Sequence, residues 1–157
     1  MPVSRAMRRL LQVLEIQEEE SRAAMESARG ELHRLERALE ASQQRERLGR
    51  RLVAASAATG EVVDRMAGLE ESRAAARLAK ALAPRIEEAA EAVEELRQVF
   101  LAKRIERRQT ETLIEETEAQ DKVEAERRGQ RDLDDWFLGR HDAREEKPRT
   151  DSPKSGS

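Results

Sequence analysis

Hydrophobic residues recur along the first third of the chain in alternating steps of four and three. The series runs through Met7, Leu11, Leu14, Glu18, Ser21, Met25, Ala28, Leu32, Leu35 and Leu39. Only Glu18 and Ser21 interrupt it, and such a period is typical of a left-handed coiled-coil seam. Leu11, Met25, Leu32 and Leu39 take position a of the heptad, and Met7, Leu14, Ala28 and Leu35 take position d. With Ser4 as N-cap, the pattern predicts a first helix over about residues 5–56.

The pattern loosens after Ser42, where three glycines follow within twenty residues: Gly49, Gly60 and Gly68. Each glycine inside a helix costs about 1 kcal/mol relative to alanine. We therefore expect the chain to reverse here, in a tip over about residues 57–76. Several apolar residues favour short helical pieces in the tip rather than a flexible linker: Leu48, Leu52, Val62, Val63, Met66 and Leu69.

A second stripe predicts another long helix over about residues 77–139. Its members are Leu78, Leu82, Ile86, Ala89, Val93, Leu96 and Phe100. Pro84 lies early in the stripe and indicates a kink, or a continuous helix that starts only there. Gly139 is a natural C-terminal stop. Residues 142–157 hold two prolines and almost no apolar side chain, so we expect a disordered tail.

Two long helices around a short reversal predict an all-α fold: a long antiparallel two-helix coiled-coil hairpin over residues 1–141. If the turn centres near Met66, Leu39 faces Val93, Leu32 faces Phe100 and Leu14 lies near Glu118. A helix of ~50 residues is ~75 Å long, so the expected object is a rod.

Composition agrees with a coiled coil and narrows the function. The chain has 157 residues, of which 40% are charged and 2% aromatic, with no cysteine and a net charge of −3. Such a chain buries a narrow seam rather than a thick core, and it offers no bulk attraction to nucleic acid. We expect no enzyme activity, no small-molecule substrate and no cofactor, because a rod has no cleft that would perturb carboxylate pKa values.

Metal and nucleic-acid sites find little support. His33 could join Glu36 and Glu40 in a metal face, but the second helix supplies no further ligands, and His141 also reads as a surface histidine. Two arginine-rich clusters lack interleaved aromatics. No apolar run reaches the roughly 20 residues that cross a bilayer, and the first residues lack the apolar stretch of a secretory signal. We expect a cytoplasmic protein.

The two predicted helices do not balance at the end where the termini meet. The first helix offers apolar residues there, whereas the facing stretch from Lys103 to Gln130 has few to receive them. The apolar residues at this end are Met7, Leu10, Leu11, Val13, Leu14, Ile16, Leu133, Trp136, Phe137 and Leu138, beside Arg8, Arg9, Arg127, Arg128 and Arg131. Exposed apolar patches usually mark contacts with partners. The alternative is that Trp136 and Phe137 pack on Leu10 and Leu14 and close the hairpin.

Two segments of the chain resemble the flagellar export protein FliJ. Residues 10–20 (LLQVLEIQEEE) resemble the opening of that family, and residues 102–108 (AKRIERR) with 124–136 (EAERRGQRDLDDW) resemble its second helix. The resemblance spans residues 5–141, although this chain lacks the tyrosines that many members carry.

The resemblance implies a cytoplasmic two-helix coiled coil, similar to the stalk of a rotary ATPase and peripherally associated with the inner membrane export apparatus. Its open end would enter a hexameric type III export ATPase, and the implied contact residues are Arg8, Arg9, Leu10, Leu11, Leu14, Arg127, Arg131, Leu133 and Trp136. It also implies contact with export chaperones and with a membrane export gate, the latter on Leu69, Leu78 and Leu82. The alternative function is a generic structural or chaperone-like coiled coil that self-associates.

Overall fold

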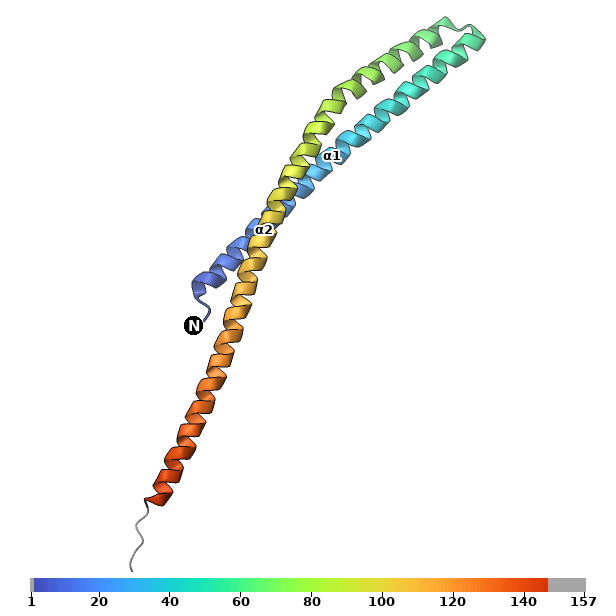
Figure 1. Cartoon of the computed structure of the whole chain (residues 1–157). Coiled ribbons are helices and arrows are strands. Elements are labelled where there is room, and N and C mark those ends of the chain that lie inside the picture. The colour runs from blue at the N-terminus through green and yellow to red at the C-terminus, as the bar shows by residue number, and fades with distance from the viewer. Residues whose placement is uncertain (1, 147–157) are drawn as a thin grey trace, which may run out of the picture. The chain divides into compact units, whose positions relative to one another are not determined.

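The computed structural model describes residues 2–146, which contain two helices and no strand (Figure 1). α1 spans Arg5–Thr59 and α2 spans Val62–Glu145. The expected all-α hairpin is confirmed. α2 continues through Gly139 and Asp142 to Glu145, so the start of the predicted disordered tail is helical. The rest of that tail, residues 147–157, lies outside the described residues.

The described chain forms two units. The hairpin unit comprises Leu10–Gln109, and the terminal unit comprises the described residues of Met1–Arg9 and Thr110–Ser157. In the hairpin unit, α1 and α2 lie side by side and run in opposite directions (Figure 1).

The turn between the helices is far shorter than expected. A tip of about twenty residues was predicted, but only Gly60 and Glu61 separate α1 from α2. Gly60 has φ +76°, a left-handed conformation that costs glycine little, and its N–H donates to Ser56 O at 2.8 Å. This single bond ends α1 in the αL motif. The tip prediction was wrong because two of the three glycines serve helix packing instead of chain reversal.

The predicted heptad of α1 is confirmed by burial, and it extends beyond the point where the sequence pattern faded. Leu14, Met25 and Leu35 are buried at predicted a and d positions. The same four-and-three steps continue through residues that are buried or half-buried although most are not hydrophobic: Ser42, Glu46, Gly49, Val53 and Ser56. The seam therefore runs to the turn without interruption.

Small residues in this part of the seam leave no polar group unpaired. Ser42 Oγ donates to Ala38 O at 2.9 Å, and Ser56 Oγ donates to Val53 O at 2.8 Å. Each hydroxyl is satisfied within its own helix, so burying it avoids the cost of an orphan donor. The described residues contain no buried side-chain nitrogen or oxygen without a hydrogen-bond partner.

Gly49 and Gly68 bring the two helix backbones together near the turn. A Cβ added to Gly49 would lie 2.7 Å from Gly68 O and 2.9 Å from Ser72 N. Both are backbone atoms and cannot rotate away. The short distance between the two helix backbones therefore requires glycine at both positions, because any side chain would separate the helices.

The observed register differs from the predicted one. Gly49 lies against Gly68. A turn centred at Met66 would have placed Gly49 opposite Ala83, which is fifteen positions farther along the chain. Moving the turn from Met66 to Gly60 accounts for twelve of these positions, since each residue of displacement shifts the pairing by two.

α2 is continuous across Pro84, so of the two alternatives, a kink or a helix that starts there, the second is excluded. Its ribbon bends in the hairpin unit and follows the outer side of the bend (Figure 1). A proline inside a helix removes one hydrogen bond and favours such a bend. The seam residues on either side include Ala75 and Leu82, which are buried, and Ala79 and Ile86, which are half-buried.

An ion pair joins the helices farther along the hairpin unit. The Arg107 guanidinium donates from Nε to the Glu18 carboxylate, and both residues hold seam positions. The side chains are only 20% and 17% exposed, respectively. The predicted register had placed Ile114 opposite Glu18. A partly buried ion pair contributes little net stability but penalises pairings that separate the charges.

In the terminal unit, Ser4 caps α1 as predicted, because Met7 N–H donates to Ser4 Oγ at 3.1 Å. Arg8 pairs with Glu118 at 3.2 Å. Ile114 is buried, whereas every described residue from Lys122 onward is exposed.

We expect Gly49→Ala to destabilise the hairpin although alanine is the better helix former. The gain in helix propensity is about 1 kcal/mol, whereas forced overlap in a packed interface costs about 1–3 kcal/mol. Gly30→Ala is the matched control, because a Cβ there meets nothing within 4 Å. Thermal unfolding followed by circular dichroism should show opposite shifts for the two variants. Equal stabilisation by both would contradict the close approach.

For the ion pair, we expect Glu18→Leu alone to cost about 1–3 kcal/mol, because the partly buried guanidinium of Arg107 loses this carboxylate. The double variant Glu18→Leu with Arg107→Leu should recover most of the loss, since apolar residues can replace a buried pair without penalty. A double-mutant cycle in urea measures the coupling. Strictly additive effects would show that the pair does not form in solution.

Candidate protein-binding surfaces

The residues predicted to contact an ATPase divide by exposure. Leu14 is buried and Leu11 is half-buried, so both belong to the interior. Leu10 is exposed, as are Arg8 and Arg9, although Arg8 already pairs with Glu118. The sequence pattern could have shown this, because Leu11 and Leu14 hold seam positions and Leu10 does not.

The C-terminal part of α2 carries the most conspicuous surface of the terminal unit. Leu133, Trp136 and Phe137 lie at helical spacings of three and four, so their side chains share one face of the helix. Trp136 is 52% exposed and Phe137 is 63% exposed. Both rings are therefore exposed, whereas the alternative of a closed hairpin required them to be buried. We call Leu133, Trp136, Phe137 and Arg140 the aromatic patch.

The side chains of the aromatic patch contact one another. The rings of Trp136 and Phe137 lie edge to face, with centroids 5.1 Å apart and planes at 76°. The Arg140 guanidinium carbon lies 4.7 Å from the Trp136 ring centroid. Such arrangements are worth about 0.5–1 kcal/mol at exposed sites. A cation and two aromatic rings on one exposed helix face form the residue set that is enriched where proteins bind one another.

The aromatic patch does not continue the seam of α2. Seam positions beyond Asp121, extended at the same period, fall on Glu124, Arg128, Arg131 and Asp135. These are charged residues, and a coiled-coil partner would have to bury them. The patch therefore suits a partner that approaches another face of α2. Arg127 and Arg131, which the resemblance implied as contacts, are exposed on the same segment.

The residues expected at an export gate also divide by exposure. Leu82 is only 4% exposed and packs in the seam of the hairpin unit, so its placement on a contact surface was wrong. Its seam position explains the burial. Leu69 and Leu78 are exposed.

A second exposed apolar surface lies at the turn of the hairpin unit, where the sequence predicted short helical pieces and the resemblance implied a gate contact on Leu69. Val62, Val63 and Met66 occupy the first turns of α2, and Val63 is 80% exposed. Met66 and Leu69 line a surface groove of about 340 Å³ together with Glu70, Arg73 and Arg77. The run of apolar residues around the turn is the sequence feature that could have indicated an exposed surface, but it predicts helices equally well.

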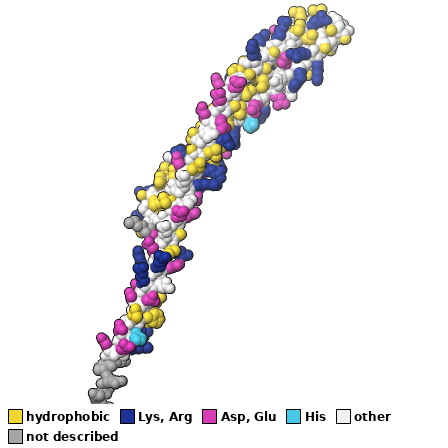
Figure 2. Space-filling view, in the orientation of Figure 1, with side chains coloured by type: hydrophobic (Ala, Val, Ile, Leu, Met, Phe, Trp, Pro, Cys, Tyr) yellow, Lys and Arg dark blue, Asp and Glu magenta, His cyan; other side chains and the backbone are white. Residues whose placement is uncertain are grey.

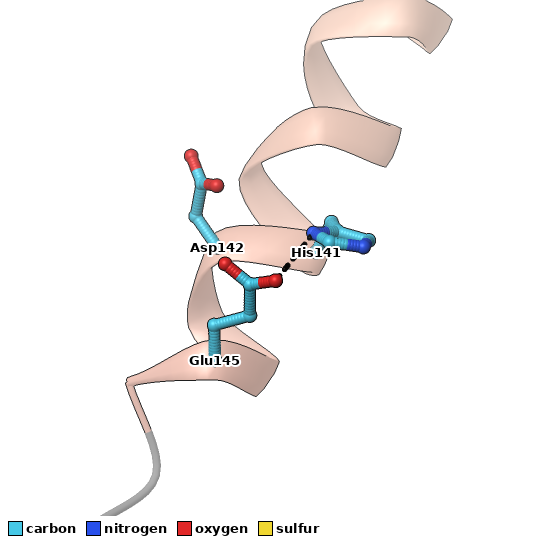
Figure 3. Close-up of side chains that lie close together, drawn as sticks. All are labelled: His141, Asp142 and Glu145. Carbon is cyan, nitrogen blue, oxygen red and sulfur yellow. Dashed lines mark ion pairs between the residues drawn. The ribbon is translucent and has the colours of Figure 1, made fainter.

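The end of α2 also brings His141, Asp142 and Glu145 together, with candidate ligand atoms within 4.8 Å of one another (Figure 3). The His141 and Glu145 side chains point toward each other, and His141 Nδ1 lies 3.7 Å from Glu145 Oε1. All three residues are exposed and belong to one helix, whereas metal sites in helical bundles collect ligands from several helices. Arg140 and Arg144 lie beside His141 and disfavour a cation. His33 is likewise exposed and lies 3.4 Å from Glu36.

No described helix combines the length and apolar character required to traverse a bilayer. Comparisons with family models, with curated proteins and with solved structures all returned no match for the chain. Function must therefore be argued from the surfaces of the chain itself.

Trp136 is the one tryptophan of the chain, so intrinsic fluorescence reports on the aromatic patch alone. We expect dilute protein to emit at the wavelength of hydrated indole, because Trp136 is 52% exposed. Acrylamide should quench it almost as efficiently as free N-acetyltryptophanamide. Blue-shifted emission that does not depend on protein concentration would show that the chain itself covers the ring.

Proposed function

We propose that the chain is a non-enzymatic stalk and regulator of a hexameric type III protein-export ATPase, of the kind that serves the flagellum. In this role it binds the ATPase ring, the membrane export gate and export chaperones. It acts in the cytoplasm, peripherally associated with the inner membrane export apparatus. The resemblance of residues 10–20 and 124–136 to FliJ supports this assignment, and a hairpin of two long helices is the architecture that the resemblance implies.

The exposed aromatic patch is the observation that carries the proposal. In the described part of the chain, residues 122–146 bury none of their side chains, although Leu133, Trp136 and Phe137 are strongly apolar. Burying an aliphatic or aromatic side chain of this size is worth about 1.5–3 kcal/mol. A partner that covers the patch would recover this free energy, and aromatic residues with a neighbouring arginine are typical anchors of protein interfaces.

The proposed ATPase contact therefore centres on Leu133 and Trp136, with Arg127 and Arg131 on the same segment. Arg9 and Leu10 of α1 are exposed as well and stay candidates for contact with the ATPase. Leu11 and Leu14 support α1 from the interior. The proposed gate contact retains Leu69 and Leu78, and Leu82 is withdrawn because it is buried.

A second candidate function is a coiled coil that self-associates. The same bare segment favours it, since a second copy could cover residues 122–146. The charged residues at the extended seam positions disfavour a coiled-coil dimer there, because it would bury Arg128 and Asp135. Light scattering separates the functions: the first predicts a particle of one 17.9 kDa chain at micromolar concentration, and the second predicts two chains.

The decisive experiment measures binding to the purified export ATPase of the source organism. We expect Leu133→Ala with Trp136→Ala to weaken binding at least roughly tenfold, because anchor residues each contribute more than ~1 kcal/mol. Stimulation of ATP hydrolysis should fall in parallel.

The matched control is Leu113→Ala, which removes an equally exposed apolar side chain from α2 outside the aromatic patch. It should leave both readouts within about twofold of the unmodified chain. If the double variant bound and stimulated the ATPase as well as the control, the aromatic patch would not be the contact.

A further inference from the structure

The end of the hairpin unit combines an uncharged apolar surface with a surrounding set of arginines. Between Leu52 and Val63 the sequence holds one charged residue, Glu61. Most side chains of this stretch are small or apolar and exposed, and Val62 and Val63 keep 64% and 80% of their surface accessible. Figure 2 shows hydrophobic side chains over the end of the hairpin, with dark blue basic side chains beside them.

Arginines flank this apolar end on both helices. Arg47 and Arg51 lie on α1 and Arg65 lies on α2, and all three are exposed. Within the described residues none of them has an ion-pair partner, in contrast to Arg45, which pairs with Glu71, and Arg50, which pairs with Glu46. We call Arg47, Arg51 and Arg65 the arginine collar.

We propose that the turn of the hairpin docks on an anionic lipid surface, with Val62, Val63 and Met66 entering the interface and the arginine collar contacting lipid phosphates. The inference goes beyond the proposed function and does not depend on it. Interfacial protein segments insert apolar residues about 5–10 Å below the headgroups while basic residues remain among them. Arg65 lies five residues after Gly60, ~8 Å along the helix, and its side chain leans toward the turn, because helical side chains tilt toward the N-terminus of their helix.

Surface form favours lipid over a protein partner. Val62 and Val63 lie in the first turn of α2 at the end of a helical hairpin, so they form a projecting surface, and of the three apolar residues only Met66 also lines a groove. A protein would need a matching cavity, whereas a bilayer accepts a projecting apolar end without prior complementarity. The groove lined by Met66 and Leu69 lies on α2 only. It contains Glu70 as well as two arginines, so its mixed charges give no preference for an acidic peptide.

The acidic residues at the turn do not oppose docking strongly. Glu61 and Asp64 lie close together, and their hydrogen bond raises the pKa of the Glu61 carboxyl above its ordinary value. A negative surface potential also lowers the interfacial pH and favours the protonated carboxyl further.

The test is sedimentation of the purified full-length chain with large vesicles. One set contains equal parts of phosphatidylglycerol and phosphatidylcholine, and the other contains phosphatidylcholine only. We expect binding to the anionic vesicles, weakened by salt, and little binding to the neutral ones. The net charge of −3 excludes bulk attraction of the whole chain as the cause. Failure to bind the anionic vesicles would overturn the proposal.

Two variants address the two parts of the surface. Arg47→Glu with Arg51→Glu should reduce vesicle affinity roughly tenfold or more. Val63→Ser with Met66→Ser should reduce it several-fold without changing charge. The matched control is Arg29→Glu with Arg37→Glu, which makes the same charge change at exposed positions of α1 far from the turn in sequence. An equal loss in the control would show general electrostatics and contradict a site at the turn.

A fluorescent reporter tests insertion directly. Val63→Trp in a Trp136→Phe background places the single indole at the turn. Its emission should shift to shorter wavelength with anionic vesicles and be quenched by brominated lipid chains. An unshifted and unquenched indole on bound protein would contradict insertion. The proposed ATPase contact includes none of the residues at the turn that we propose to contact lipid, so the two proposals fail independently.

Discussion

The seven-residue repeat that joins α1 to α2 is the constraint on which the hairpin unit depends. The repeat continues to the turn because Ser42, Gly49 and Ser56 replace larger residues where the backbones approach. Large side chains at these positions would push the helices apart. A turn of two residues could then no longer connect them in the same geometry. The seam also fixes which side chains remain outside it. Val62, Val63 and Met66 are exposed because the seam residues beside them, Gly68 and Ser72, face α1.

Stability and specificity come from different parts of the seam. Leu35 and Leu82 are buried and contribute hydrophobic free energy, whereas Glu18 and Arg107 contribute mainly by selecting one register. A seam of alanine and leucine alone would permit neighbouring registers at similar free energy, because heptads repeat. Polar seam residues therefore explain how a low-aromatic chain obtains a defined pairing, at some cost in total stability.

Sequence periodicity predicted the fold class, the N-cap at Ser4 and the heptad assignment of α1, because these depend on local pattern. It did not predict the turn, because Gly49 and Gly60 are the same residue type in opposite roles: one allows close helix packing and the other adopts positive φ. Nothing local to either residue distinguishes the roles. The register inherited this error. For the candidate sites, Trp136 and Leu133 were identified as unbalanced apolar residues and are exposed, whereas Leu14 and Leu82 were assigned to surfaces although their heptad positions already indicated burial.

The two exposed apolar surfaces differ in a way that assigns them different kinds of partner. The aromatic patch presents two rings in an edge-to-face contact with Arg140 against one of them, and large aromatic rings favour a partner with a shaped pocket. The turn presents short aliphatic side chains around a two-residue connection, with Arg47, Arg51 and Arg65 unpaired among the described residues. Such a surface gains free energy from any apolar phase with negative charge at its boundary and offers little basis for shape recognition. We propose a protein partner for one surface and a membrane surface for the other, and α2 joins the two surfaces as one continuous helix from Val62 to Glu145.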